Sequence, residues 1–382
     1  MIKPPSPLLI LLLTVATYAS VWNGKADTKW YKDSESEFTI TTPEQLAGLA
    51  KLVNKGNDFK GKTIKLGANI MLNDTANWRN WEKKKPKNKW KPIGFEKYTY
   101  FGYIGHLTLS HTTDNYFSGT FDGNGFAVSG VYVSGNNAYV GLFGYVFVGA
   151  IKNLGVTASY VKGGSYVGGL VGFIDGQIIN CYSKAFVKGS TMVGGLAGKI
   201  GISSSKNQII NSYSTGTVTG KKEVGGLVGD LFGDIINGYS TGTVTGEEEV
   251  GGLVGNLFGN ITNSYSSSMV TGDSVIGGFV GTCYRGNITN SYSSGMVTGG
   301  SVVGGFVGHS GKESEIINSY YDKETSKQNY GIGEVEIIGK YIIKGKSTAE
   351  MKRKETYNGW DFDKVWGIDS MVNGGYPHLR TE

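Results

Sequence analysis

The stretch Val224-Gly225-Gly226-Leu227-Val228-Gly229 decides the fold, because near-copies of it recur along the chain. Close copies begin at Val167, Val193, Val250, Ile276 and Val303, and a looser one spans Val140 to Gly144. Measured from the leucine or its phenylalanine substitute, the steps between copies are 26, 31, 26, 26 and 27 residues. A fixed period this short is typical of a solenoid.

One period holds three strand-like runs. The motif is followed by Asp234-Ile-Ile-Asn-Gly-Tyr-Ser240 and then by Gly242-Thr-Val-Thr-Gly246. These runs are rich in Val, Ile, Thr and Tyr and are separated by Gly, Asn and Ser, as expected of short strands joined by tight turns. We therefore predict an all-β fold, a right-handed parallel β-helix with about 26 residues and three strands per coil, in which each strand pairs with its equivalent about 4.8 Å away.

Equivalent residues of such a stack lie above one another, so its columns follow from the alignment of the repeats. Three aliphatic columns should be buried: Val187, Val218, Val244, Val270 and Val297; Ile178, Ile209, Ile235, Ile261, Ile288 and Ile316; and Leu170, Leu196, Leu227, Leu253, Phe279 and Phe306. Glycines should stand where the backbone bends or approaches its neighbour, at Gly169, Gly195, Gly226, Gly252, Gly278 and Gly305. A ladder of side-chain amides is expected at Asn180, Asn211, Asn237, Asn263, Asn290 and Asn318. All these columns are interpreted as structural.

The repeats resemble the GLUG motif of secreted bacterial proteins, named for Gly-Leu-hydrophobic-Gly. Gly-Gly-Leu-Val-Gly stands at Gly168, Gly225 and Gly251, Gly-Gly-Leu-Ala-Gly at Gly194, and copies at Gly277 and Gly304 replace Leu by Phe. The likeness continues upstream through residues 42–50, 119–125 and 139–144. This resemblance implies export and a surface, adhesin-like or accessory role, and it carries over no catalytic residue.

The two ends of the chain have their own patterns. Residues 1–19 combine a lysine, an apolar run and Thr17-Tyr18-Ala19, which predicts a signal peptide and a bacterial protein that is secreted or held at the cell surface. No other long apolar segment follows, so no membrane span is expected in the mature chain. Thr42, Pro43 and Gln45 predict a capped helix that ends at Gly56, and Ser347 with Glu350 predicts a second, extending to about Thr356. We expect these helices, the second with the aromatic residues after it, to close the two ends of the β-helix.

The repeat pattern breaks between Asn73 and Tyr116. This insertion carries aromatic residues and closely spaced lysines, namely Trp78, Trp81, Trp90, Tyr98, Tyr100, Phe101, Tyr103, Lys83, Lys84, Lys85, Lys87, Lys89 and Lys91. Long insertions into a regular scaffold often carry function, and such side chains suit sugars or acidic surfaces. We therefore predict ligand binding by Trp78, Trp81, Tyr98, Tyr100 and Tyr103. The alternatives are a solvated lysine loop whose residues 90–94 pack on the helix, or a site at the variable corners before each motif, such as Lys221 to Glu223.

Catalytic constellations are not evident in the sequence. Asp230 and Asp234 flank one corner, but their equivalents one coil later are Asn256 and Asn260, so carboxylates do not accumulate. The histidines show no metal spacing, the turn sequence Asp122-Gly-Asn-Gly125 suits a tight turn, and no cofactor motif is seen. Cys181 and Cys283 lie several coils apart, too far for a disulfide. A net charge of +6 does not indicate nucleic-acid binding.

The segments expected are a signal peptide over 1–19, an N-terminal part with helix and first strands over 20–72, the insertion over 73–116, the repeats over 117–319 and a C-terminal cap over 320–382. The predicted function is non-enzymatic adhesion or binding, with a polysaccharide or a cell-surface glycan or protein as partner. One alternative is a polysaccharide-degrading β-helix enzyme. A more remote one is an ice-binding protein, because Thr217, Thr219, Thr243 and Thr245 form a short Thr-x-Thr array that ends at Met269. The oligomeric state does not follow from the sequence.

Overall fold

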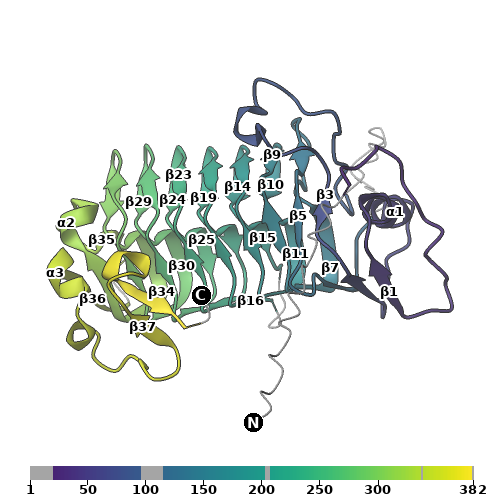
Figure 1. Ribbon diagram of the computed structural model, residues 1–382. Helices are drawn as coiled ribbons and strands as arrows, with labels where there is room; N and C mark the ends of the chain where they lie inside the picture. The colour runs from purple at the N-terminus through teal and green to yellow at the C-terminus, as the bar shows by residue number, and fades with distance from the viewer. Residues whose placement is uncertain (1–19, 96–114, 203–206, 337–338, 381–382) are drawn as a thin grey trace, which may run out of the picture.

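The computed structural model describes residues 20–95, 115–202, 207–336 and 339–380. The predicted signal peptide and the candidate residues Tyr98, Tyr100 and Tyr103 lie outside these ranges. The described chain forms a parallel β-solenoid of about 11 turns, which confirms the predicted fold class (Figure 1). No helix among the described residues has the length and apolarity needed to cross a membrane.

Three sheets run along the solenoid, and each stacks equivalent strands in parallel. The motif sheet contains β10 (Ser165–Gly168), β14 (Thr191–Gly194), β19 (Lys222–Gly225), β24 (Glu248–Gly251), β29 (Val275–Gly277) and β33 (Val302–Gly304). The threonine-containing sheet contains β6 (Tyr132–Val133), β9 (Tyr160–Lys162), β13 (Phe186–Lys188), β18 (Thr217–Thr219), β23 (Thr243–Thr245), β28 (Met269–Thr271) and β32 (Val297–Thr298).

The third and largest sheet takes up the rest of each coil. Its strands are β1 (Glu37–Ile40), β2 (Thr63–Leu66), β3 (Ile70–Met71), β4 (Thr120–Asp122), β5 (Ala127–Ser129), β7 (Phe143–Lys152), β8 (Gly155–Thr157), β11 (Val171–Ile179), β12 (Tyr182–Ser183), β15 (Ala197–Ile200), β16 (Gln208–Ile210), β17 (Tyr213–Ser214), β20 (Val228–Leu231), β21 (Asp234–Ile236), β22 (Tyr239–Ser240), β25 (Val254–Phe258), β26 (Ile261–Thr262), β27 (Tyr265–Ser266), β30 (Val280–Thr289), β31 (Tyr292–Ser293), β34 (Val307–Asp322), β35 (Ile332–Val335) and β36 (Lys340–Lys346). A typical coil therefore has five short strands in three sheets, where three strands were expected.

The repeated motif forms a corner and not a single strand. In the coil around Leu227, β19 ends at Gly225 and β20 begins at Val228, so Gly226 and Leu227 make the bend. A Cβ atom on Gly226 would collide with the carbonyl oxygen of Gly252 and with Oγ of Ser240. The Leu227 side chain is fully buried. Glycine is needed because adjacent coils approach closely at the corner, and leucine is needed because the side chain beside it enters the core.

The predicted aliphatic columns are buried and pair in register from coil to coil. Ile235, for example, lies beside Ile209 and Ile261, and Val244 beside Val218 and Val270. They belong to one continuous apolar core that runs from the first to the last coil. Cys181 and Cys283 are buried free thiols in this core, as expected.

The predicted asparagine ladder is present in two parts, because no hydrogen bond joins Asn263 to Asn237, whose Oδ1 is buried without a partner. The structure also adds a second reason for the asparagine column. Asn211 donates to Asn180 Oδ1 at 3.1 Å and Asn237 donates to Asn211 Oδ1 at 2.9 Å. Each of the six asparagines also has a positive φ, between 49° and 55°. Asparagine tolerates this left-handed conformation better than most residues, so one residue type provides both the turn and the ladder.

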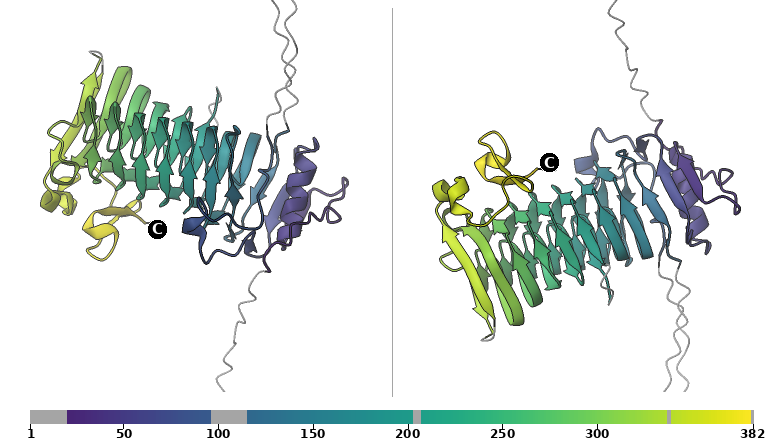
Figure 2. Two further views of the ribbon diagram at one scale, coloured as in Figure 1. Left: turned by 90° about the horizontal axis from the view of Figure 1, so that it is seen from above. Right: turned by 90° about the horizontal axis from the view of Figure 1, so that it is seen from below.

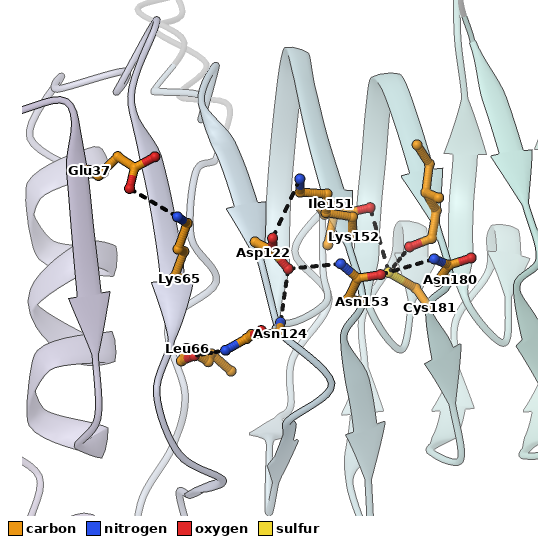
Figure 3. Close-up of polar contacts among 11 residues, drawn as sticks. Glu37, Lys65, Leu66, Asp122, Asn124, Ile151, Lys152, Asn153, Asn180 and Cys181 are labelled. Atoms are coloured by element: carbon orange, nitrogen blue, oxygen red, sulfur yellow. Dashed lines mark hydrogen bonds and ion pairs between the residues drawn. The ribbon is translucent and has the colours of Figure 1, made fainter.

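The ladder continues upstream to the tight turn at Asp122 (Figure 3). Asn180 donates to Asn153, and Asn153 donates to Asp122 Oδ1 at 3.0 Å. The same carboxylate accepts the backbone N–H of Asn124 at 2.9 Å and lies 3.4 Å from Lys152 Nζ. Asp122 is thus committed to the turn and the ladder, as its sequence context predicts.

The helix α1 (Pro43–Val53) lies at the N-terminal end of the stack (Figure 1). The predicted capping box between Thr42 and Gln45 is present. Leu46, Leu49 and Val53 are fully buried and join the same core as β1 and β2. The helix ends at Val53, three residues before Gly56, with Asn54 as its C-cap. It therefore covers core side chains that the first coil would otherwise expose.

The C-terminal part continues the stack and then turns to its side. After α2 (Lys323–Ser326), β35 and β36 add a last layer on β34. The second predicted helix begins at its capping box but is shorter than expected, as α3 (Thr348–Met351), followed by the 3-10 turns η2 (Lys354–Thr356) and η3 (Asn373–Gly375). An antiparallel hairpin of β37 (Trp366–Ile368) and β38 (Pro377–Leu379) completes the C-terminal part.

The aromatic residues of this segment pack beside the last coils, not across their end (Figure 2). Trp360, Phe362 and Trp366 share a buried cluster with the outer tyrosine column at Tyr265, Tyr292 and Tyr320. These tyrosines are at most 1% exposed. The expectation of an aromatic lid at the end is corrected in this respect, because Trp366 packs on Tyr265 and Tyr292 of the outer column.

Candidate functional site

The insertion is anchored on the outside of the first coils. Asn73 and Asn88 close its base, because the Asn73 amide donates to Asn88 O at 2.8 Å and accepts the Asn88 N–H at 2.9 Å. The Asn73 amide also donates to Gly130 O at 2.9 Å. Beyond this base, the Trp90 indole donates to Leu142 O at 3.0 Å. Residues 74–87 therefore form a loop whose two ends are fixed to the solenoid.

Trp81 pins the middle of that loop and does not present a free ring. It is 3% exposed and packs edge-on against Tyr132, whose ring stacks on Tyr160. Trp78, in the 3-10 turn η1 (Trp78–Asn80), is half-buried against the same cluster and has the Arg79 guanidinium 4.9 Å from its ring centroid. The prediction that Trp81 stacks on a ligand is therefore corrected, because its ring is buried in the contact that holds the loop.

The residues of the threonine-containing sheet could have indicated from the sequence where the insertion is anchored. The column that holds Thr217 and Thr243 in later coils holds Tyr132, Tyr160 and Phe186 in the first coils. Aromatic residues replace threonine where the insertion covers the sheet. Burial raises the pKa of the Tyr160 phenol to about 12.

The alternative packing of residues 90–94 against the helix is confirmed. Asn54, at the end of α1, donates to Pro92 O and accepts the Gly94 N–H, both at 2.9 Å. Trp90 is 2% exposed. In the described part of the insertion the lysines are therefore exposed, whereas Trp81 and Trp90 are buried and Trp78 is half-buried.

The lysines of the insertion are exposed and lack acidic partners among the described residues. Lys83, Lys84, Lys85, Lys87, Lys89 and Lys91 are all exposed. Glu82, the residue before this run, is already paired with Lys188 Nζ at 2.8 Å, and that hydrogen bond lowers the pKa of Glu82. The anchored loop therefore displays uncompensated positive charge.

The variable corners are less suited to recognition because their charges pair along the stack. Lys221 Nζ lies 3.5 Å from Glu247, and Lys222 Nζ lies 3.4 Å from Glu248. Each pair joins equivalent positions of successive coils. The corners thus resemble a ladder of surface ion pairs, which contributes little energy per pair.

An acidic cluster beside these corners was missed by the sequence analysis. It contains Glu223, Asp230 and Glu249, which interact electrostatically across two coils. Lys199 Nζ lies 2.7 Å from Asp230 Oδ2, and Tyr284 donates to Glu249 Oε1 at 3.0 Å. The signal was hidden because Asp230 follows the motif while Glu223 precedes it, and only the bend brings them together.

Burial controls the electrostatics of this cluster. It raises the pKa of Glu223 to about 7, helped by the negative charges of Asp230 and Glu249. Burial also raises the pKa of Asp230, although Lys199 and Asn256 donate hydrogen bonds to it. Oε2 of Glu223 and Oε2 of Glu249 are buried without a hydrogen-bond donor. Such a cluster can hold a proton near neutral pH.

The aromatic rings beside this cluster stack on one another, so they present ring edges and not ring faces to a ligand. Phe232, Phe258 and Tyr284 stack at centroid distances of 4.3 and 5.0 Å, and Lys199 Nζ lies 4.5 Å from the Phe232 centroid. Because the ring faces contact one another, a sugar ring cannot lie flat between them. Among the described residues, no group of three His, Cys, Asp or Glu side chains is arranged to hold a metal ion.

A parallel β-helix with a glycine-leucine corner in each repeat defines the class of this protein. The family described as the GLUG motif matches residues 163–186. A crystal structure from Bacteroides ovatus, described as a "putative immunoglobulin A1 protease", shares 21% sequence identity and a TM-score of 0.57, covering 92% of this chain and 94% of that chain. At this identity the likeness supports the fold alone. No curated protein matches the sequence. The chain is thus a β-helix protein that carries the GLUG motif in its repeats.

Proposed function

We propose that this protein is exported by a bacterium and binds polysaccharide or a glycan-bearing cell surface without cleaving it. The observation that supports this most is the anchored insertion, in which Asn73, Asn88 and Trp81 hold a lysine-bearing loop on a rigid solenoid. A binding group held on a rigid scaffold loses less conformational entropy on association than a free loop does.

The test is retention of the mature protein on insoluble polysaccharides, together with an assay for released reducing ends. Retention without release is expected. A matched control is Lys221→Ala, which removes an exposed charge at a coil corner outside the insertion. Retention by none of the polysaccharides or glycan-bearing surfaces tried would contradict the proposal.

A β-helix enzyme that degrades polysaccharide is the second candidate, favoured by the acidic cluster. A carboxyl group with a pKa near 7 beside other carboxylates is a combination that glycoside hydrolysis uses. However, Asp230 is 2% and Glu249 5% exposed, so a substrate would have to displace neighbouring side chains to reach them. Release of reducing ends that is lost in both Glu223→Gln and Asp230→Asn would favour this candidate over binding.

A further inference from the structure

The charge of the ligand follows from the surroundings of the insertion lysines. Two shallow depressions flank the run of residues 84–91. The first, of about 310 Å³, is lined by Lys89, Lys91 and Lys162, together with Ser134 and Asn137. The second, of about 290 Å³, is lined by Lys84, Lys85 and Lys87, together with Asn77, Asn88 and one carboxylate, Asp74. Each depression thus gathers three lysines and neutral hydrogen-bonding groups, and in the second the lysines outnumber the single carboxylate by three to one.

None of these six lysines has an ion pair or a side-chain hydrogen bond with another described residue, although the charge of Lys162, with that of Lys188, lowers the pKa of Glu82. Lys162 comes from β9 of the solenoid, so the first depression is built from both the insertion and the coils. Lys91 lies 4.8 Å from the Phe95 ring centroid, which restricts its stem without neutralising its charge. Three like charges around one depression repel one another, and an anionic group would relieve that repulsion.

We infer that the two lysine-lined depressions bind the carboxylate, sulfate or phosphate groups of an acidic polysaccharide. This inference rests on the proposed function for the polymer class and adds the charge of the sugar. Lysine binds such groups as a point charge, and the neighbouring amide and hydroxyl groups can hydrogen-bond to sugar hydroxyls.

A nucleic acid is the less suitable polyanion here. Binding of single strands relies on aromatic rings that stack on bases, but Trp81 and Trp90 are 3% and 2% exposed. Binding of a duplex relies on an extended basic surface, whereas the coil corners carry the acidic run Glu247 to Glu249. Two separate depressions suit a polymer with spaced anionic groups.

The test compares two triple variants that lose the same charge. The first is Lys89→Gln/Lys91→Gln/Lys162→Gln. The control, Lys323→Gln/Lys340→Gln/Lys364→Gln, changes exposed lysines of the C-terminal part. The probe is polygalacturonate, with neutral dextran and duplex DNA for comparison, in calorimetric titrations at low and at physiological salt. Thermal melting should show that both variants remain folded.

We expect the site variant to bind polygalacturonate about tenfold more weakly or worse, the control to stay within about twofold of the parent, and added salt to weaken the parent. An equal loss in both variants would mean that only net charge matters and would overturn the site. Equal or tighter binding of DNA would overturn the polysaccharide class. Retention on a neutral polysaccharide with no effect of the site variant would refute this inference alone, whereas no retention on any polysaccharide would refute the proposed function.

Discussion

Replacing Glu223 by glutamine should make the protein more stable at alkaline pH and leave its stability nearly unchanged at acid pH. Glu223 precedes the motif corner and lies directly above Glu249 of the next coil, since the flanking residues pair in register. Asp230, Lys199 and Lys222 are the other charges that act on it. Its pKa is about 7, against an ordinary value of 4.5, because of burial and the two nearby carboxylates.

The size of the effect follows from that difference. A raised carboxyl pKa means that the folded state holds the proton more tightly than the unfolded state, so stability is lost as pH rises from 4.5 through 7. The pKa difference of 2.5, at about 1.4 kcal/mol per pH unit, gives an upper limit of about 3.5 kcal/mol. Two charges about 5 Å apart at an effective dielectric constant of about 20 repel by a similar amount, about 3 kcal/mol. Lys199 and Lys222 reduce the net value.

The assay is the thermal midpoint of the parent and of Glu223→Gln from pH 4.5 to 8.5. The difference in the free energy of unfolding that these midpoints give should grow through pH 5 to 7. It should reach about 1 to 3 kcal/mol, with the variant the more stable protein. Glu247→Gln is the matched control, because its side chain is 57% exposed one coil away, and its difference from the parent should stay flat. A Glu223→Gln difference that does not change with pH would refute the burial and the charge proximity inferred for this cluster.

Other substitutions test the packing. Leu227→Asp places a charge in the core and should cost several kcal/mol, whereas Lys221→Ala at an exposed corner should be nearly neutral in thermal melting; equal shifts would invalidate the assignment of inner and outer positions. Asn237→Ala should cost about 1 to 2 kcal/mol and Asn237→Gly less, because φ is 55° there; equal costs would show that the ladder bond, which both variants lose, outweighs the turn. Trp81→Ala should expose the insertion to proteolysis and cost about 3 kcal/mol, while unchanged protection would place the anchor elsewhere.

The repeats were predictable because in a parallel stack the sequence period and the spatial period coincide. Once Leu170, Leu196 and Leu227 are aligned, each column is a list of equivalent positions, and burial of one member implies burial of the others. The capping boxes at Thr42 and Ser347 were equally local, because they depend on residues three positions apart. The number of strands per coil was not predictable in this way, because the apolar run Val224 to Val228 does not show that its middle residue, Gly226, is a bend.

The non-repeated contacts were not predictable in the same way. Trp78 and Trp81 are two tryptophans only three positions apart, yet Trp81 is buried against Tyr132 and Trp78 is only partly buried. That difference in burial depends on where the insertion contacts the threonine-containing sheet, whose strands lie more than 40 residues later in the chain. The lateral packing of Trp366 on Tyr265 and Tyr292 has the same origin, because it joins a terminal segment to an outer column of the repeats.

The sequence by itself determined the repeat, its register and its buried columns, because side-chain pattern and backbone turn chemistry act within one coil. Only the tertiary structure decided which charges meet and which aromatic rings are covered. Glu223, Asp230 and Glu249 converge because the chain bends at Gly226 and stacks on the next coil, and Lys162 joins Lys89 and Lys91 because the insertion folds back over β9. The pKa of Glu223 and the proposed anion-binding depressions depend on distances between segments, which no local pattern specifies.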